Sequence, residues 1–257
     1  DLHRVVEVAA QLLTAACGRR RIRRFTAEVL VENQAMLQVF ADAGFPATRR
    51  VADGVSSWEI ATDPTEPALL AADVRESVAE RRSLQPLLYP SSVAVVGVRR
   101  DGGGIGHAVL TSILRGGFTG DLWVVHPTAE QVVGVPAYQD LGAVPGHVDV
   151  LVVAVPSGQV LEVVGDAARH GVSTVVVISS GFSGLGRAGD RMERAVLRIA
   201  REHDIRILGP NCLGLLCNDP AIRLNATFSA AVPTAGGLAV GSQSGGVGIA
   251  LLDLARE

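Results

Sequence analysis

A glycine-rich turn follows an apolar, β-branched run and precedes a segment with helical spacing. The run is Val93–Val96, and residues 105–113 place apolar side chains on one helical face. The turn between them contains Gly97, Gly102, Gly103, Gly104 and Gly106. Glycines let a backbone approach a ligand closely, and the unpaired N–H groups at a helix start favour negative charge. This order of elements predicts a phosphate-binding site.

The sequence argues against a nicotinamide or flavin dinucleotide at this loop. The glycines do not form the pattern G-x-G-x-x-G, and the next predicted strand ends at His126 and Pro127, where a ribose-binding carboxylate would be expected. An NAD(P)-binding, redox-sensing Rossmann module stays open as the alternative function. The glycines could also serve only as a tight turn.

Composition limits the classes of protein and partner. The chain has 257 residues, of which 48% are hydrophobic and 19% charged, as in a globular protein with a well-formed core. A net charge of −3 argues against nucleic acid and anionic membranes as partners. No apolar segment approaches the ~18 residues of a membrane span, and the N-terminus has no signal-peptide pattern, so we predict a cytoplasmic protein. Lysine is absent, which excludes a Schiff base and a Walker lysine.

The cysteines predict neither a disulfide framework nor a metal site. Cys17, Cys212 and Cys217 are odd in number and have no metal-ligand spacing. We therefore expect reduced, mostly buried thiols and no bound metal.

The first part of the chain has its own pattern. We predict a helix over residues 4–16, a strand over 22–31, a helix over 33–44 with Asn33 as its N-cap, and a hairpin at Asp53-Gly54. Residues 63–88 then read as a helical linker.

From Tyr89 onward, buried strands alternate with helices. Strands are predicted at 92–97, 121–126, 148–155, 173–179 and 205–208, and helices at 105–115, 158–170 and 188–203, with a short irregular helix at 137–142. This alternation is typical of an α/β fold with a doubly wound parallel sheet. Ligands of such sheets lie at the carboxyl ends of the strands.

Four short motifs then identify a family. They are "VPSGQV" at 155–160, "ISSGFSGLG" at 178–186, "GPNCLG" at 209–214 and "GSQSGG" at 241–246. In this order they resemble the NDP-forming acyl-CoA synthetases, relatives of the succinyl-CoA synthetase α chain. The resemblance implies a Rossmann-like CoA-binding domain followed by the start of a flavodoxin-like domain.

The resemblance also implies which residues bind CoA or acyl-CoA. They are Gly97, Arg99, Gly102, Gly103, Gly104, Gly106, His126, Pro127, Pro156, Ser179, Ser180, Gly181, Phe182 and Asn211. Two positions depart from the family pattern, because Thr128 replaces a usual lysine and Gly184 a usual glutamate. Arg99 and Arg100 could supply the missing positive charge.

A later loop carries the second role that the resemblance implies. Ser242, Gln243, Ser244 and Gly245 begin a predicted helix after an apolar run, 238–240, that we expect to be a buried strand. In the family this helix start supports a phosphorylated histidine. None of the six histidines here has that histidine's sequence context, and no nucleotide-grasp region is present. We therefore assign no catalytic residue and expect ATP or ADP with Mg²⁺ only in a full-length parent.

Residues 27–45, "AEVLVENQAMLQVFADAGF", resemble the C-terminal half of a GNAT-superfamily acetyltransferase. Phe40 stands where many members have a tyrosine acid, and Glu28 and Glu32 read as solvated carboxylates rather than bases. The acetyl-CoA pyrophosphate loop of that superfamily would precede Asp1.

Together these features predict a partial GNAT α+β domain (1–62), a linker (63–88), a CoA-binding domain (89–232) and the start of a flavodoxin-like domain (233–257). We expect a fragment of an acetyltransferase–acyl-CoA synthetase fusion. Its parent would make acyl-CoA, or sense CoA to control acetylation of a protein lysine. A homo-oligomer is left open.

Overall fold

The computed structural model describes residues 23–42, 45–61, 65–182 and 186–255. The chain divides into two compact units, Asp1–Arg82 and Ser83–Glu257. Among the described residues, no helix is long and apolar enough to cross a membrane. The predicted helix over residues 4–16 lies outside the described part, as does Cys17.

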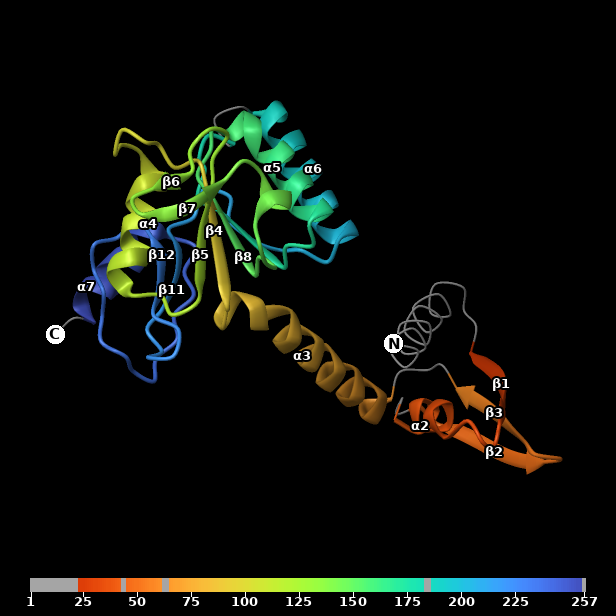
Figure 1. Cartoon of the computed structure of the whole chain (residues 1–257). Helices are drawn as coiled ribbons and strands as arrows, with labels where there is room; N and C mark the ends of the chain where they lie inside the picture. The colour runs from red at the N-terminus through yellow and green to blue at the C-terminus, as the bar shows by residue number, and fades with distance from the viewer. Residues whose placement is uncertain (1–22, 43–44, 62–64, 183–185, 256–257) are drawn as a thin grey trace. The chain divides into compact units, whose positions relative to one another are not determined.

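In the first unit, the described residues up to Ala61 form a small antiparallel sheet with a helix packed on it (Figure 1). Its elements are β1 (Arg24–Leu30), α2 (Gln34–Asp42), β2 (Ala47–Ala52) and β3 (Val55–Ala61), with the strand order β1-β3-β2. Val29, Leu37, Trp58 and Ile60 form its core because alternate strand residues and one helix face meet there.

Two local predictions for this unit are confirmed. The Oδ1 atom of Asn33 accepts a hydrogen bond from the Met36 N–H group at 3.1 Å, as an N-cap should. The β2–β3 hairpin turns at Asp53 and Gly54, whose φ angles of 49° and 77° are those of a two-residue turn with both residues at positive φ. The predicted helical segment after this hairpin is also present, as α3 (Glu66–Leu88).

The second unit is built on a seven-stranded sheet. The strands are β4 (Ser92–Val96), β5 (Asp121–Val125), β6 (Gln131–Val132), β7 (Val135–Tyr138), β8 (Val150–Val153), β9 (Thr174–Val177) and β10 (Arg206–Leu208). Their order is β10-β9-β8-β4-β5-β7-β6, and every pair is parallel except β6 with β7. After β4, strands β5 and β7 are added on one side of the sheet, whereas β8, β9 and β10 are added on the other side. A topological switch point therefore lies between β4 and β8. The predicted α/β fold with a parallel sheet is confirmed.

Helices and a hairpin cover the two faces of this sheet (Figure 1). One face packs against α4 (Ile105–Gly116) and the hairpin of β11 (Gly214–Cys217) and β12 (Leu224–Thr227), and the other against α5 (Ser157–Arg169) and α6 (Arg187–Glu202). Because β4, β8 and β9 are buried on both faces, their sequences are nearly continuous in valine. This packing fixes the starts of α4 and α5 against the sheet.

Two sequence predictions differ from the structure in this unit. The short irregular helix expected at 137–142 is confined to Leu141–Ala143, a 3-10 helix capped by Asp140, because 135–138 form strand β7 between β5 and β6. The run 238–240 is not a buried strand: Leu238 is 86% exposed, and no described strand pairs with the run. The helix that follows, α7 (Gly245–Leu254), has no buried residue. An apolar run forms a buried strand only where a sheet offers it a neighbour.

Candidate functional site

The predicted CoA-binding residues all follow carboxyl ends of strands in one sheet. Gly97–Gly106 follow β4, His126 and Pro127 follow β5, and Pro156 follows β8. Ser179–Phe182 follow β9, and Asn211 follows β10. Because parallel strands end at a common edge, the fold gathers segments separated by more than 100 residues.

The glycine loop packs on backbone atoms at the switch point. A Cβ atom on Gly97 would lie 2.5 Å from the Ala154 carbonyl oxygen, and one on Gly106 would lie 2.4 Å from the Gly97 carbonyl oxygen. Real Cβ atoms do not come that close, so both positions require glycine. These contacts hold the first turn of α4 directly against the ends of β4 and β8.

The described helices that begin at this edge, α4, α5 and α6, have no capping side chain. The N-caps of α4 and α5 are Gly104 and Pro156, and neither supplies a side-chain hydrogen bond. By contrast, Asn33 caps α2 and Ser244 caps α7, where Ser244 Oγ accepts from the Val247 N–H group at 3.4 Å. The first N–H groups of α4 and α5 are therefore free for an anionic ligand.

Asp101 is the charged group bound most closely to the glycine loop. Its Oδ1 atom accepts a hydrogen bond from the Gly103 N–H group at 3.1 Å, and its Oδ2 atom accepts one from the Arg99 guanidinium. The hydrogen bond from the Gly103 N–H group, and to a smaller extent the one from Arg99, hold the pKa of the Asp101 carboxyl below its ordinary value. Arg99, expected to face a ligand phosphate, is thus paired within the loop.

His107 carries a buried polar atom without a partner. Its Nδ1 atom forms no hydrogen bond in the described structure, although the atom is shielded from solvent. A Cβ atom on Gly102 would lie 3.9 Å from the ring carbon Cε1, so the imidazole supports the glycine loop from the first turn of α4. Sequence reasoning missed this residue, because a histidine at a helix start has no distinctive pattern.

His126 shapes the turn after β5. Its Nδ1 atom accepts hydrogen bonds from the N–H groups of Thr128 at 3.2 Å and Ala129 at 3.0 Å. A ring nitrogen that accepts carries no proton, so a neutral His126 holds its proton on Nε2. The ring therefore accepts the hydrogen bonds that an asparagine side chain accepts in an Asx-turn.

Ser179 and Asn211 tie the other loops together. The Ser179 hydroxyl donates to the Val155 carbonyl oxygen at 2.5 Å, and the Asn211 N–H group donates to the Ser179 carbonyl oxygen at 3.1 Å. Asn211 has a φ of 57°, and Gly209 before it could carry no side chain, since a Cβ atom would lie 2.4 Å from the Val177 carbonyl oxygen. The buried Ser179 hydroxyl thus positions backbone, whereas Ser180 is exposed at the edge.

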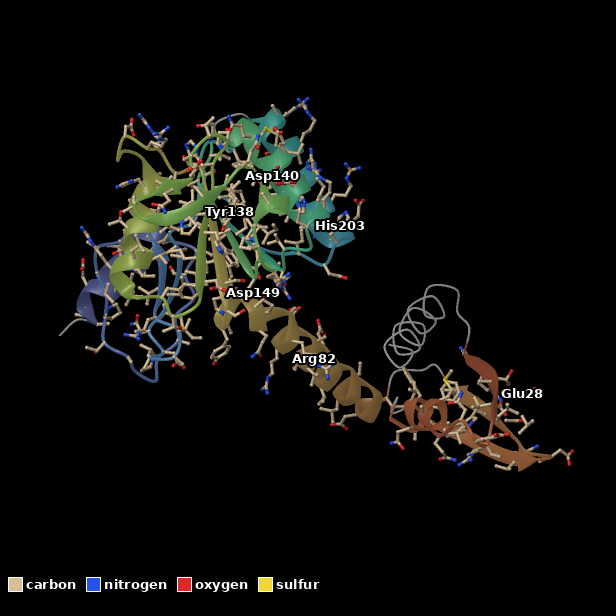
Figure 2. All side chains as sticks on the ribbon, in the orientation of Figure 1. Glu28, Arg82, Tyr138, Asp140, Asp149 and His203 are labelled. Carbon is tan, nitrogen blue, oxygen red and sulfur yellow. The ribbon has the colours of Figure 1, made fainter. Side chains whose placement is uncertain are left out.

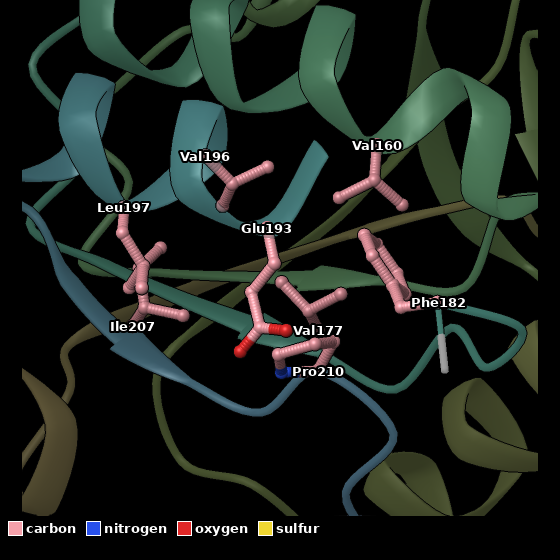
Figure 3. Close-up of a pocket in the computed structure, with 8 residues that line it drawn as sticks. All are labelled: Val160, Val177, Phe182, Glu193, Val196, Leu197, Ile207 and Pro210. Atoms are coloured by element: carbon pink, nitrogen blue, oxygen red, sulfur yellow. The ribbon is translucent and has the colours of Figure 1, made fainter. Parts of the chain in front are cut away.

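Phe182 points into the core (Figure 3). Its ring is 5% exposed and packs with Val160 of α5, Val177 of β9 and Val196 of α6. Gly181, at φ 101°, lies beside the start of α5, since a Cβ atom on it would be 3.4 Å from the Ser157 hydroxyl oxygen. The ring therefore anchors the loop that carries Ser180 and Gly181.

The loop of Ser242, Gln243, Ser244 and Gly245 lies next to the "GPNCLG" segment. A Cβ atom on Gly248 of α7 would lie 3.2 Å from a methyl group of Leu213, two residues after Asn211. The Ser242 hydroxyl donates to the Ser244 carbonyl oxygen at 3.1 Å, and the Ser244 N–H group donates back to it. These serines shape the loop, and the helix predicted to begin there is present as α7, capped by Ser244.

The described residues offer few groups for chemistry. No group of three or more histidine, cysteine or carboxylate side chains among them could hold a metal ion. Cys212 and Cys217 are free and half-buried, less buried than predicted. Burial raises the pKa of the Cys212 thiol, which donates to the Val177 carbonyl oxygen at 3.3 Å. The site consists of backbone N–H groups, hydroxyls and arginine, which can bind an anion.

Comparisons with known proteins agree with this arrangement. Residues 91–218 match the family model of a CoA binding domain. ADP-forming acetate–CoA ligase II of Archaeoglobus fulgidus is 38% identical over 158 residues, which are 59% of this chain and 24% of the relative. The alpha subunit of ADP-forming acetate–CoA ligase I of Pyrococcus furiosus is 37% identical over 174 residues, 66% of this chain and 37% of that subunit.

A solved structure shows the same fold at higher identity. It is the dinucleotide forming acetyl-coenzyme A synthetase 1 of Ca. Korarchaeum cryptofilum in complex with phosphate and ADP, with 41% sequence identity and a TM-score of 0.62. The match covers 66% of this chain and 36% of that protein. The chain thus spans well under half the length of these relatives. Residues 91–218 therefore match a CoA binding domain, and this part of the chain is similar to the Rossmann-like CoA-binding domain of ADP-forming acyl-CoA synthetases.

Proposed function

We propose that this chain binds CoA or an acyl-CoA at the carboxyl edge of the seven-stranded sheet. The observation that carries the proposal is the loop Gly97–Gly106, which brings the uncapped start of α4 to the switch point of a domain in the CoA-binding family. The phosphates of CoA would lie at this loop. The segments at His126, Pro156 and Ser179–Phe182 would then line the rest of the ligand.

Isothermal titration calorimetry of the full chain tests this proposal. CoA and acetyl-CoA are expected to bind, whereas NAD⁺ and NADP⁺ at the same concentrations are not, because His126 stands where a dinucleotide fold needs a ribose-binding carboxylate. Binding of NAD⁺ or NADP⁺ without CoA would favour a redox-sensing module instead.

A matched pair of glycine variants locates the ligand. Gly104 and Gly134 both have positive φ, 86° and 80°, but Gly134 lies in the β6–β7 turn at the opposite edge of the sheet. We expect Gly104→Val to weaken CoA binding by about tenfold or more, through one or two lost charge-assisted hydrogen bonds. Gly134→Val should leave the affinity unchanged, and equal effects of the two would refute this placement.

For the protein as a whole we propose an acyl-CoA synthetase that, with Mg²⁺, joins a carboxylic acid to CoA and converts ATP to ADP and phosphate. The printed names of the relatives, which are ADP-forming CoA ligases, support this. Residues 233–257 would begin its flavodoxin-like domain, and the exposed apolar side chains of Leu238, Val247 and Leu254 would pack against that domain.

We further propose that residues 1–62 come from a GNAT acetyltransferase acting on a protein lysine, joined by the linker 63–88. The support is the strand–helix–hairpin order of β1, α2, β2 and β3 with its Asn33 cap. Phe40 packs on Trp58 with ring centroids 5.6 Å apart, and Glu28 is exposed on β1 (Figure 2). With no catalytic acid or base assigned, we expect no acetylation of a lysine peptide by this chain and acetyl-CoA, which mass spectrometry would check. Acetylation above the uncatalysed background would contradict that expectation.

A further inference from the structure

Asp101 holds two groups that the glycine loop would offer to a phosphate. One is the Gly103 N–H group, which donates to Asp101 Oδ1 at 3.1 Å. The other is the Arg99 guanidinium, which donates to Asp101 Oδ2. Both partners belong to the loop that the proposed function assigns to the ligand's phosphates.

A carboxylate and a phosphate compete for the same donors. Backbone N–H groups near a helix start and guanidinium groups are preferred partners of both anions. If the Asp101 carboxylate stayed in place, it would stand beside a phosphate of the same sign. A ligand that uses Gly103 and Arg99 must therefore move Asp101 away.

We propose that Asp101 is an internal competitor for the phosphate subsite, released when the ligand binds. The inference rests on the proposed function and adds that Asp101 lowers the affinity of the site for CoA. Arg99 then serves the ligand only after it has left Asp101.

The geometry allows this exchange of partners. The Arg99 and Asp101 side chains are 67% and 55% exposed, and an ion pair so exposed contributes little to stability. A Cβ atom on Gly102, which has a φ of 79°, would meet only the edge of the His107 ring, so there is open space beside the loop at this residue. The buried Nδ1 atom of His107, beside the loop, has no hydrogen-bond partner among the described residues.

Two substitutions at Asp101 separate competition from loop shaping. Asp101→Asn keeps a side-chain oxygen that can accept from the Gly103 N–H group but removes the negative charge. Asp101→Ala removes both. Titration of the full-length chain with CoA by calorimetry, at low and at moderate salt, gives the affinity of each variant.

A charge-matched control and a double variant complete the design. Glu130→Gln removes one exposed carboxylate that lies outside the loop, after the His126 turn. Arg99→Ala, alone and combined with Asp101→Asn, tests whether the two side chains act through each other.

Competition predicts that Asp101→Asn tightens CoA binding by about twofold to fivefold, the range of an exposed ion pair. Glu130→Gln should leave the affinity within error of the unsubstituted chain. Arg99→Ala should weaken binding, and the gain from Asp101→Asn should shrink in its background.

The opposite results overturn the proposal in distinguishable ways. Unchanged or weaker binding by Asp101→Asn, or an equal gain from Glu130→Gln, shows that Asp101 does not compete, while the proposed function stands. A loss with Asp101→Ala and no change with Asp101→Asn shows that Asp101 only shapes the loop. Absence of CoA binding by the unsubstituted chain and all variants refutes the proposed function itself.

Discussion

Replacing Gly106 by alanine should move the start of α4 off the switch point. The added Cβ atom would lie 2.4 Å from the Gly97 carbonyl oxygen and 2.8 Å from its carbon, both backbone atoms that cannot rotate away. Cβ atoms essentially never approach other heavy atoms closer than 3.0 Å, so helix and loop must separate by at least about 0.6 Å.

The sign of the effect follows from two opposing contributions. Overpacking of this kind costs about 1–3 kcal/mol, and a contact with backbone at this distance belongs at the upper end. Alanine in a helix gains at most ~1 kcal/mol over glycine. We therefore expect Gly106→Ala to lower the free energy of unfolding of the second unit by about 2 kcal/mol and to weaken CoA binding.

Gly165 provides the matched control. It lies inside α5, where a Cβ atom would meet only the flexible Arg169 side chain at 3.7 Å. Gly165→Ala should thus raise the free energy of unfolding by about 0.5–1 kcal/mol. Urea denaturation followed by tryptophan fluorescence, in a Trp58→Phe background so that Trp123 alone reports, measures both variants.

Equal midpoints for Gly106→Ala and the parent chain would refute the reasoning, since they would mean that the loop can retreat without cost. A stabilised Gly106→Ala variant would do the same. If both glycine variants were destabilised alike, the cause would be general to helical glycines and not the contact with Gly97.

Three further predictions concern individual contacts. Asp149 lies at the amino end of β8 (Figure 2), and its Oδ2 atom accepts hydrogen bonds from the Ser91 N–H group at 2.8 Å and the Ser91 hydroxyl at 2.6 Å. Asp149→Ala should therefore lower the free energy of unfolding, measured by urea denaturation, by about 1–2 kcal/mol. The hydrogen bond from the Arg24 guanidinium lowers the pKa of the Glu59 carboxyl. The ion pair therefore stabilises the fold above the ordinary carboxyl pKa, and this stabilisation is lost as the pH falls through the lowered pKa of Glu59. Glu59→Gln should thus make stability depend less on pH in acid, which circular dichroism would measure. Because burial raises the pKa of the Cys212 thiol, peptide mapping should find it alkylated by iodoacetamide at pH 8 more slowly than free cysteine.

The sequence predicts the larger unit well because its strands are buried on both faces. Continuous valine runs such as those at β8 and β9 have few other structures to adopt, and glycines after β4 indicate the loop. The two-residue strand β6 carries too little pattern to be read alone. Residues 238–240 are apolar and were therefore predicted to be a buried strand, but Leu238 and Val240 are exposed. An apolar run alone does not specify which strand or helix would cover it.

The functional edge was predictable in position but not in the role of each side chain. Ser179 and Phe182 were expected along the ligand, yet the hydroxyl bonds the Val155 carbonyl oxygen and the ring packs in the core. Such roles depend on contacts between loops far apart in the sequence, which spacing does not report. The position of His107 beside the glycine loop likewise could not be predicted from its spacing in the sequence.

The contacts at this edge also explain why a binding role fits better than a catalytic one in the described residues. Gly97 meets the Ala154 backbone, Ser179 bonds the Val155 carbonyl oxygen, and Asn211 bonds the Ser179 carbonyl oxygen. Backbone atoms tied in this way keep fixed positions and leave helix N–H groups directed at one place, which suits a group of constant shape and charge such as a phosphate. A catalytic acid or base needs a titratable side chain aimed at the reacting atom. At the loop, Asp101 holds Arg99 and His126 holds a turn, whereas the buried Nδ1 atom of His107 has no partner among the described residues. The arrangement of this edge therefore suits the invariant part of a CoA thioester, the ligand proposed for it above.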